Sequence, residues 1–114
     1  MPYIDVKLTK SISDAEKTEL KAELGNAISL FPGKTEAWLM VNIEDGKSMW
    51  FKGENSEACA FVEVKLFGSV DKNGSEKFTE ELCSYFSSKL SVSPDKVYVR
   101  YEGGTDWGWN KSNF

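Results

Sequence analysis

The fold is decided by the stretch PYIDVKL at residues 2–8 and by the helical pattern that follows it. Polar and apolar side chains alternate along this stretch, and a period of two indicates a strand with one buried face. Residues 13–16 (SDAE) match a capping box, a pattern that opens helices. One apolar stripe at helical spacing follows, and Pro32-Gly33 ends it. The stripe consists of Leu20, Leu24, Ala27, Ile28 and Phe31.

A second strand completes this first unit. Residues 37–43 (AWLMVNI) are almost continuously apolar and predict a buried strand. A strand, a crossover helix and a further strand form a βαβ unit. In such a unit the two strands are parallel and the crossover is right-handed.

The second half of the chain repeats this order. Residues 61–67 alternate like the first strand, Asn73 and Glu76 offer a helix start, and residues 97–101 (VYVRY) predict the last core strand. The second helical stripe consists of Phe78, Leu82, Tyr85, Phe86 and Leu90. We therefore expect two similar βαβ halves, about residues 2–57 and 58–114.

These patterns predict a single α+β domain over residues 1–114. It consists of a four-stranded mixed sheet with two helices on one face and a pseudo-two-fold axis between the halves. Two aromatic segments, residues 49–51 and 107–109, have no obvious place in this plan and are expected as short strands or bends. Aromatic residues make up 13% of the chain. Since the sheet has an open face and two edges, we expect self-association.

Composition excludes several classes of function. The formal net charge is −4 and the pI is about 4.9, which argues against nucleic acid as a partner because phosphates require a basic face. The chain has no histidine, which excludes Ser-His-Asp and Cys-His catalysis and histidine-ligated metals. Cys59 and Cys83 do not form a CxxC motif and are expected to be buried, reduced thiols.

The chain also lacks the marks of membrane insertion and classical export. No apolar run approaches about 20 residues, so we expect no membrane span. The first ten residues contain no apolar segment typical of a secretory signal. We therefore expect a cytoplasmic protein.

Six short motifs occur in order along the chain, and together they resemble one known family. They are Met1-Pro2 opening directly into a strand, Gly33-Lys34, Met49-x-Phe51-x-Gly53, Ser56-Glu57-x-Cys59-Ala60, Asp95-Lys96-Val97-Tyr98 and Trp107-Gly108-Trp109-Asn110-x-Ser112-x-Phe114. No single motif is specific, but the ordered set resembles the macrophage migration inhibitory factor (MIF) family of the tautomerase superfamily over essentially the whole chain.

The resemblance implies a homotrimer with three active sites at its subunit interfaces, each built around an N-terminal proline. Pro2 would be the general base once Met1 is removed, because an α-amino group titrates near neutrality. Otherwise Pro2 merely starts an edge strand. Lys34 would bind a carboxylate or enolate oxygen of the substrate and lower the pKa of the Pro2 amine, or it only complements a helix C-terminus. Tyr98 would reach the site from the neighbouring subunit and donate a hydrogen bond, or it is an ordinary core or interface aromatic.

The remaining candidate residues concern the shape and charge of the pocket. Four aromatic residues match positions that line or rim the family's apolar pocket, namely Phe67, Trp107, Trp109 and Phe114. The family usually has isoleucine at Phe67 and an aliphatic residue at Trp107, so this pocket is expected to be narrower. Plain packing is the alternative for all four. Arg100 lies on the same strand face as Tyr98. It replaces an asparagine of MIF and is either a second cation for a carboxylate or a solvated surface residue.

The resemblance implies a cofactor-free keto–enol tautomerase, an isomerase of the phenylpyruvate or dopachrome type, with a small aromatic 2-keto acid as substrate. The main alternative is a MIF-like cytokine that leaves cells without a signal peptide and engages a host receptor, with weak or vestigial tautomerase activity. A third reading is a scaffold whose altered site, with Phe67, Arg100 and Trp107, no longer turns over.

Overall fold

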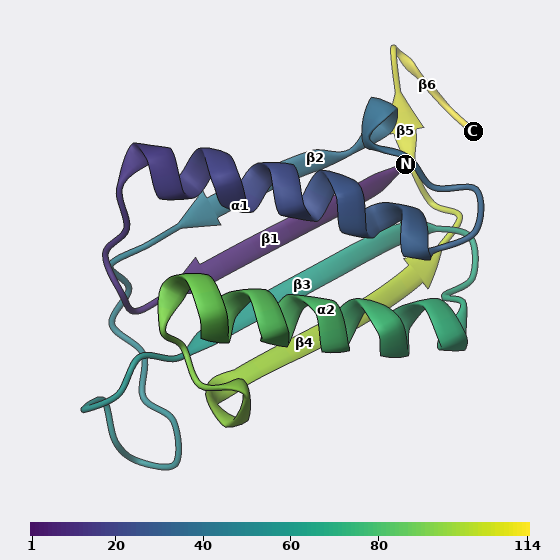
Figure 1. Ribbon diagram of the computed structural model, residues 1–114. Coiled ribbons are helices and arrows are strands. Elements are labelled where there is room, and N and C mark those ends of the chain that lie inside the picture. Colours follow the sequence, from purple (N-terminus) through teal and green to yellow (C-terminus); the bar gives the residue numbers. More distant parts are fainter.

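Two helices cover one face of a four-stranded mixed sheet (Figure 1), which confirms the expected fold class. The computed structural model describes residues 1–114. In chain order the elements are β1 (Pro2–Leu8), α1 (Asp14–Ala27), the 3₁₀ turns η1 (Ile28–Leu30) and η2 (Glu36–Trp38), β2 (Met40–Glu44), β3 (Ala60–Phe67), α2 (Lys72–Leu90), the 3₁₀ turn η3 (Pro94–Lys96), β4 (Val97–Gly104), β5 (Gly108–Trp109) and β6 (Ser112–Asn113).

The strand order of the sheet is β2-β1-β3-β4. β1 runs parallel to β2, and β3 runs parallel to β4, so each half of the chain has the strand pairing of a βαβ unit. β1 and β3 meet antiparallel at the centre of the sheet. An antiparallel contact between two similar halves is the arrangement that a two-fold relation between them produces.

The core lies between the sheet and the two helices. Both helical stripes expected from the sequence are buried there, except that Tyr85 is half-buried and packs against the edge of the core. The inward residues of β1 and β3 face the helices. They are Ile4, Val6, Leu8, Val62, Val64 and Leu66, all at most 1% exposed. The period-two pattern therefore assigned these strand faces correctly.

The two helices begin in different ways. The capping box of α1 is formed, since the Ser13 hydroxyl accepts a hydrogen bond from the Glu16 amide and the Glu16 carboxylate accepts one from the Ser13 amide. α2 begins at Lys72, so the helix start expected at Asn73 is wrong. Asp71 caps this helix instead, because its carboxylate accepts a hydrogen bond of 2.8 Å from the Gly74 amide.

The second strand differs from its prediction. Residues 36–38 form the turn η2, and β2 begins only at Met40. Met40 is exposed and the other residues of β2 are only partly buried. The expected buried strand over residues 37–43 is therefore wrong in its start and in its burial. The reason is position, because β2 is an edge strand and pairs with a neighbouring strand on only one side.

The two aromatic segments lie outside the main sheet. Within residues 49–51, only Phe51 forms a β-bridge, to Glu54. Trp109 lies in the small hairpin β5–β6, which stands off the sheet beside the N-terminus (Figure 1). Neither helix combines the length and the apolar character that crossing a membrane requires.

The closing of the sheet at the end of β4 depends on one glycine and supplies a stability test. A Cβ added at Gly103 would lie 2.5 Å from the Gly68 carbonyl oxygen, whereas one added at Gly104 would meet nothing within 4 Å. Gly103→Ala should therefore reduce the free energy of unfolding by about 1–3 kcal/mol, as other overpacked sites do. The matched variant Gly104→Ala should change it by less. Urea denaturation of both variants checks this, and equal stabilities would contradict it.

Candidate active site

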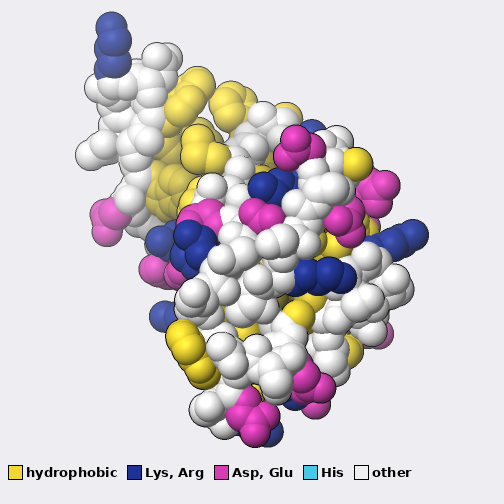
Figure 2. All heavy atoms as spheres, turned by 90° about the vertical axis from the view of Figure 1, so that its left-hand side faces the viewer, with side chains coloured by type: hydrophobic (Ala, Val, Ile, Leu, Met, Phe, Trp, Pro, Cys, Tyr) yellow, Lys and Arg dark blue, Asp and Glu magenta, His cyan; other side chains and the backbone are white.

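The start of β1 borders an apolar pocket. Pro2 is buried and pairs with Leu66 of β3. The pocket beside it has a volume of about 480 Å³. Its lining consists of Met1, Pro2, Tyr3, Ala37, Trp38, Leu39, Met40, Lys65, Trp107, Gly108 and Trp109. Figure 2 shows hydrophobic side chains gathered beneath the protruding C-terminal hairpin. Three of the expected residues, Pro2, Trp107 and Trp109, are thus brought together in one cavity.

Tryptophans form much of the pocket wall. Trp38 from η2 and Trp109 from β5 meet edge to face, with ring centroids 5.3 Å apart. Aromatic pairs prefer this geometry because the positive edge of one ring faces the negative face of the other. Trp107 adds a third indole to the same lining. A wall of this kind favours a flat apolar ligand.

The terminal amine next to the pocket is electrostatically perturbed. Burial lowers the pKa of the Met1 amine below its ordinary value, and the nearby Lys34 ammonium lowers it further. The Pro2 nitrogen is a tertiary amide while Met1 is attached, and removal of Met1 converts it to a secondary amine. A lower pKa increases the fraction of neutral amine, which is the form that can accept a proton.

Lys34 is fixed close to this terminus. Its ammonium donates a hydrogen bond of 2.8 Å to the Phe67 carbonyl oxygen, and the Phe67 amide donates one of 3.1 Å to the Met1 carbonyl. The end of β3 thereby links the lysine to the start of β1. Lys34 nevertheless lines a separate cavity of about 310 Å³, together with Phe67.

Two further candidates pack on each other and do not line the Pro2 pocket within this chain. The Phe67 and Phe114 rings have centroids 5.1 Å apart. Phe114 follows β6 and remains 47% exposed. In a single chain these two residues border the pocket region but do not form its wall.

Tyr98 and Arg100 lie far from Pro2 within one chain. Tyr98 pairs with Phe61 on β3, five positions from the Leu66–Pro2 pair, a distance of roughly 16 Å along the strand. Its ring contacts Phe51, with centroids 5.2 Å apart. Arg100 is exposed on the same sheet face, and its guanidinium donates to the Tyr101 carbonyl oxygen at 3.1 Å.

Sequence reasoning did not single out three lining residues, Trp38, Met40 and Lys65. Trp38 and Met40 fell inside the stretch that was expected to be a buried strand, so they were counted as core. Lys65 had a usable signal, because the period-two pattern of β3 places it on the face opposite Leu66. That pattern alone gave no reason to connect this face with Pro2.

Two βαβ units joined edge to edge, with a pocket at the start of the central strand, define a protein of the tautomerase fold. The family model described as "Macrophage migration inhibitory factor (MIF)" matches residues 1–114, and the chain therefore belongs to this family.

Individual relatives agree with this assignment. Macrophage migration inhibitory factor of Mus musculus is 28% identical over 106 residues, which cover 91% of this chain and 88% of the mouse protein. The crystal structure of Leishmania major MIF2 is 24% identical, covers 100% of this chain and 97% of its own, and superposes with a TM-score of 0.90. The crystal structure of Pt0534 inactivated by 2-oxo-3-pentynoate is 15% identical, with coverages of 97% and 94% and a TM-score of 0.83.

The influence of Lys34 on the terminal amine can be measured directly. Lys34→Met removes the cation and should raise the pKa of the Met1 amine toward its ordinary value. The rise should be incomplete, because burial is the larger cause of the lowering. The pH dependence of acetylation at the N-terminal peptide, followed by mass spectrometry, reports this pKa.

Lys77→Met serves as the matched control, because Lys77 is exposed on α2. It should leave the pKa of the amine unchanged. Equal acetylation profiles for the Lys34→Met variant and the parent protein would show that Lys34 does not act on the terminus.

Proposed function

We propose that this protein is a cofactor-free keto–enol tautomerase that uses the amine of Pro2 as its general base after removal of Met1. One observation carries the proposal. Pro2 is buried in the wall of a tryptophan-lined pocket, and burial and Lys34 both lower the pKa of the adjoining Met1 amine. Membership of the MIF family supports the same reading.

The proposed reaction moves one proton. The neutral Pro2 amine removes a proton from the carbon next to a ketone. The electron pair of the broken C–H bond forms a carbon–carbon double bond, and the π pair of the carbonyl moves to its oxygen to give an enolate. Transfer of the same proton from the Pro2 ammonium to this oxygen completes the enol, and the reverse steps regenerate the ketone. Lys34 favours this sequence because its positive charge disfavours the protonated form of the amine.

An aromatic 2-keto acid such as phenylpyruvate fits the character of the pocket. The indole rings of Trp38, Trp107 and Trp109 offer flat apolar walls for the aromatic ring. The 2-oxo acid that inactivated Pt0534 supports this substrate class, since that protein has the same fold. We therefore take phenylpyruvate as the test substrate.

We further propose that the site is completed in a homotrimer, with Tyr98 and Arg100 supplied by a neighbouring subunit. Two exposed aromatic surfaces support this assembly. One contains Trp38 and Trp109, which are 56% and 54% exposed, and the other contains Trp50 and Tyr98, at 62% and 59%. Unlike surfaces that contact each other head to tail close into a ring when the rotation fits.

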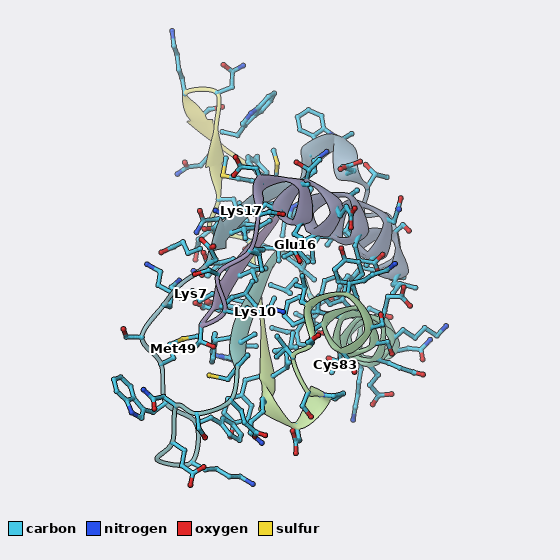
Figure 3. All side chains as sticks on the ribbon, turned by 60° about the vertical axis from the view of Figure 1, so that its left-hand side comes forward. Lys7, Lys10, Glu16, Lys17, Met49 and Cys83 are labelled. Carbon is cyan, nitrogen blue, oxygen red and sulfur yellow. The ribbon has the colours of Figure 1, made fainter.

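The two surfaces lie at different ends of the molecule. Figure 3 labels Met49 in the loop after β2, away from the hairpin β5–β6, and Met49 shares a small apolar cavity with Trp50 and Tyr98. A neighbouring copy that seats this loop beside Pro2 would bring Tyr98 across the gap that one chain leaves. The proposed shared site thus accounts for both aromatic segments that lie outside the main sheet.

Blocking the proline amine tests the chemistry. An alanine inserted between Met1 and Pro2 leaves the Pro2 nitrogen in a peptide bond and should reduce phenylpyruvate tautomerisation by about 10²-fold or more, the usual contribution of a general base. The rate of tautomerisation is measured by ultraviolet absorbance, which monitors formation of the enol. Circular dichroism confirms that the variant is folded.

Labelling provides a second readout for the same amine. In the parent protein, 2-oxo-3-pentynoate should add to the N-terminal proline. In the inserted-alanine variant, Pro2 should stay unlabelled. Undiminished turnover in the insertion variant would rule out Pro2 as the base. A free proline amine without turnover would favour the alternative function, a MIF-like protein that binds a receptor.

Mixing of two inactive variants tests the shared site. The inserted-alanine variant lacks the base, and Tyr98→Ala lacks the residue proposed to come from the neighbour. When the two are unfolded and refolded together in equal amounts, about a quarter of the interfaces in a random ring should combine an intact Pro2 with an intact Tyr98. Activity should reappear to about that extent.

Light scattering serves as the accompanying measurement of mass. The proposed trimer should have about three times the mass of the 12.8 kDa chain. A mass near one chain at micromolar concentration, or a mixture as inactive as its components, would contradict a site shared between subunits.

A further inference from the structure

Lys65 provides the only charged side chain in the lining of the pocket around Pro2. Of the 11 residues that line this pocket, 8 are hydrophobic. Lys65 lies on β3 in register with Tyr3, next to the pair formed by Leu66 and Pro2. The ammonium group therefore belongs to the residue next to Leu66, which is the cross-strand partner of the proposed base.

This lysine is not engaged by other groups of the protein. The ion pairs of the structure involve Lys7, Lys17, Lys21, Lys47 and Lys96. Glu102 is the residue in register with Lys65 on β4, yet the two form no ion pair. Side-chain hydrogen bonds are donated by Lys7, Lys10, Lys34 and Lys96. Lys65 is absent from both sets.

Lys34 differs from Lys65 in both respects. Its ammonium already donates to the Phe67 carbonyl oxygen at 2.8 Å, and it lines a neighbouring cavity rather than the one beside Pro2. The two lysines therefore lie in different surroundings, one tied to the chain terminus and one bordering the space where a ligand would lie.

We infer that Lys65 binds the carboxylate of the substrate and thereby makes the pocket selective for aromatic acids; this inference rests on the proposed function. A carboxylate that enters an apolar pocket loses water, which is costly unless a partner of opposite charge replaces it. The long flexible stem of lysine can cover apolar surface while its ammonium meets the anion.

The placement also fits the reacting carbon of a 2-keto acid. With the carboxylate at Lys65 and the ring among the tryptophans, the carbon that loses a proton lies between these two anchors. Pro2 lines the same pocket as Lys65 and the three indoles. The roles of the lysines then separate: Lys65 sets the affinity for acids, and Lys34 sets the pKa of the amine.

A binding experiment that needs no turnover tests this assignment. The probes are 3-phenylpropanoate and its neutral amide, and their binding is followed by quenching of tryptophan fluorescence, since three indoles line the pocket. Lys65→Met should weaken binding of the acid about ten-fold or more, the usual value of a charge-assisted hydrogen bond. Binding of the amide should change little, and Lys65→Arg should retain most of the affinity for the acid.

Kinetics supply the second readout. Lys65→Met should raise KM for phenylpyruvate by a similar factor while leaving kcat, the pH profile and the KM of the methyl ester close to the parent values. Lys77→Met is the matched control, since Lys77 is an exposed lysine on α2 without an ion pair. It should leave the KM of both the acid and the ester unchanged. Thermal melting of each variant confirms that the fold is kept.

The outcomes separate this inference from the proposed function. Binding of the acid that depends on Lys65, without turnover in any variant, would support the inference and overturn the tautomerase proposal. Turnover with an unchanged KM in Lys65→Met would support the tautomerase proposal and overturn the role of Lys65. Equal weakening of acid and amide, or no binding of the acid to the parent protein, would also overturn the role of Lys65.

Discussion

The antiparallel pairing of β1 with β3 is the interaction on which the rest of the structure depends. It joins the two βαβ units, and it makes β1 an interior strand flanked on both sides. An interior strand that begins at residue 2 brings the chain terminus to the end of β3 rather than leaving it free at the surface. Proline can occupy this position because the first residue of a strand can do without a ladder hydrogen bond.

The same pairing organises the charges around the terminus. The last residues of β3 carry the carbonyl that holds Lys34, the register that brings Leu66 beside Pro2, and the side chain of Lys65. A one-residue slip between β1 and β3 would turn every one of these side chains to the opposite face. The fully buried residues Ile4, Val6, Val62 and Val64 oppose such a slip, since it would expose them. Core packing thus fixes the geometry of the candidate site.

Much of the fold could be predicted from the sequence because its strongest signals are local. The alternation in residues 2–8 and the capping box at Ser13 depend only on neighbouring residues, and both were found as expected. The start of β2 could not be predicted in the same way. Whether AWLMVNI is buried depends on which strand occupies the edge of the sheet, and this is a property of the whole topology.

The candidate site was less predictable than the fold for a related reason. Pro2 and Trp107 could be named from the family motifs, and they line one pocket. Trp38 and Lys65 join them only through strand register and the path of the turn η2, which no local pattern encodes. Tyr98 could be named from the family motifs, but it lies far from Pro2 within one chain. Any contact between the two residues therefore depends on the assembly of several chains.

The absence of histidine has a consequence for the amine held between β3 and Lys34. Histidine is the side chain that ordinarily changes charge near neutral pH, and this chain contains none. The terminal amine, whose pKa is lowered from its ordinary value by burial and by Lys34, therefore has few competitors in that range. A ligand that displaces or attracts the proton of this amine should therefore change the number of protons that the protein exchanges with the buffer near neutral pH.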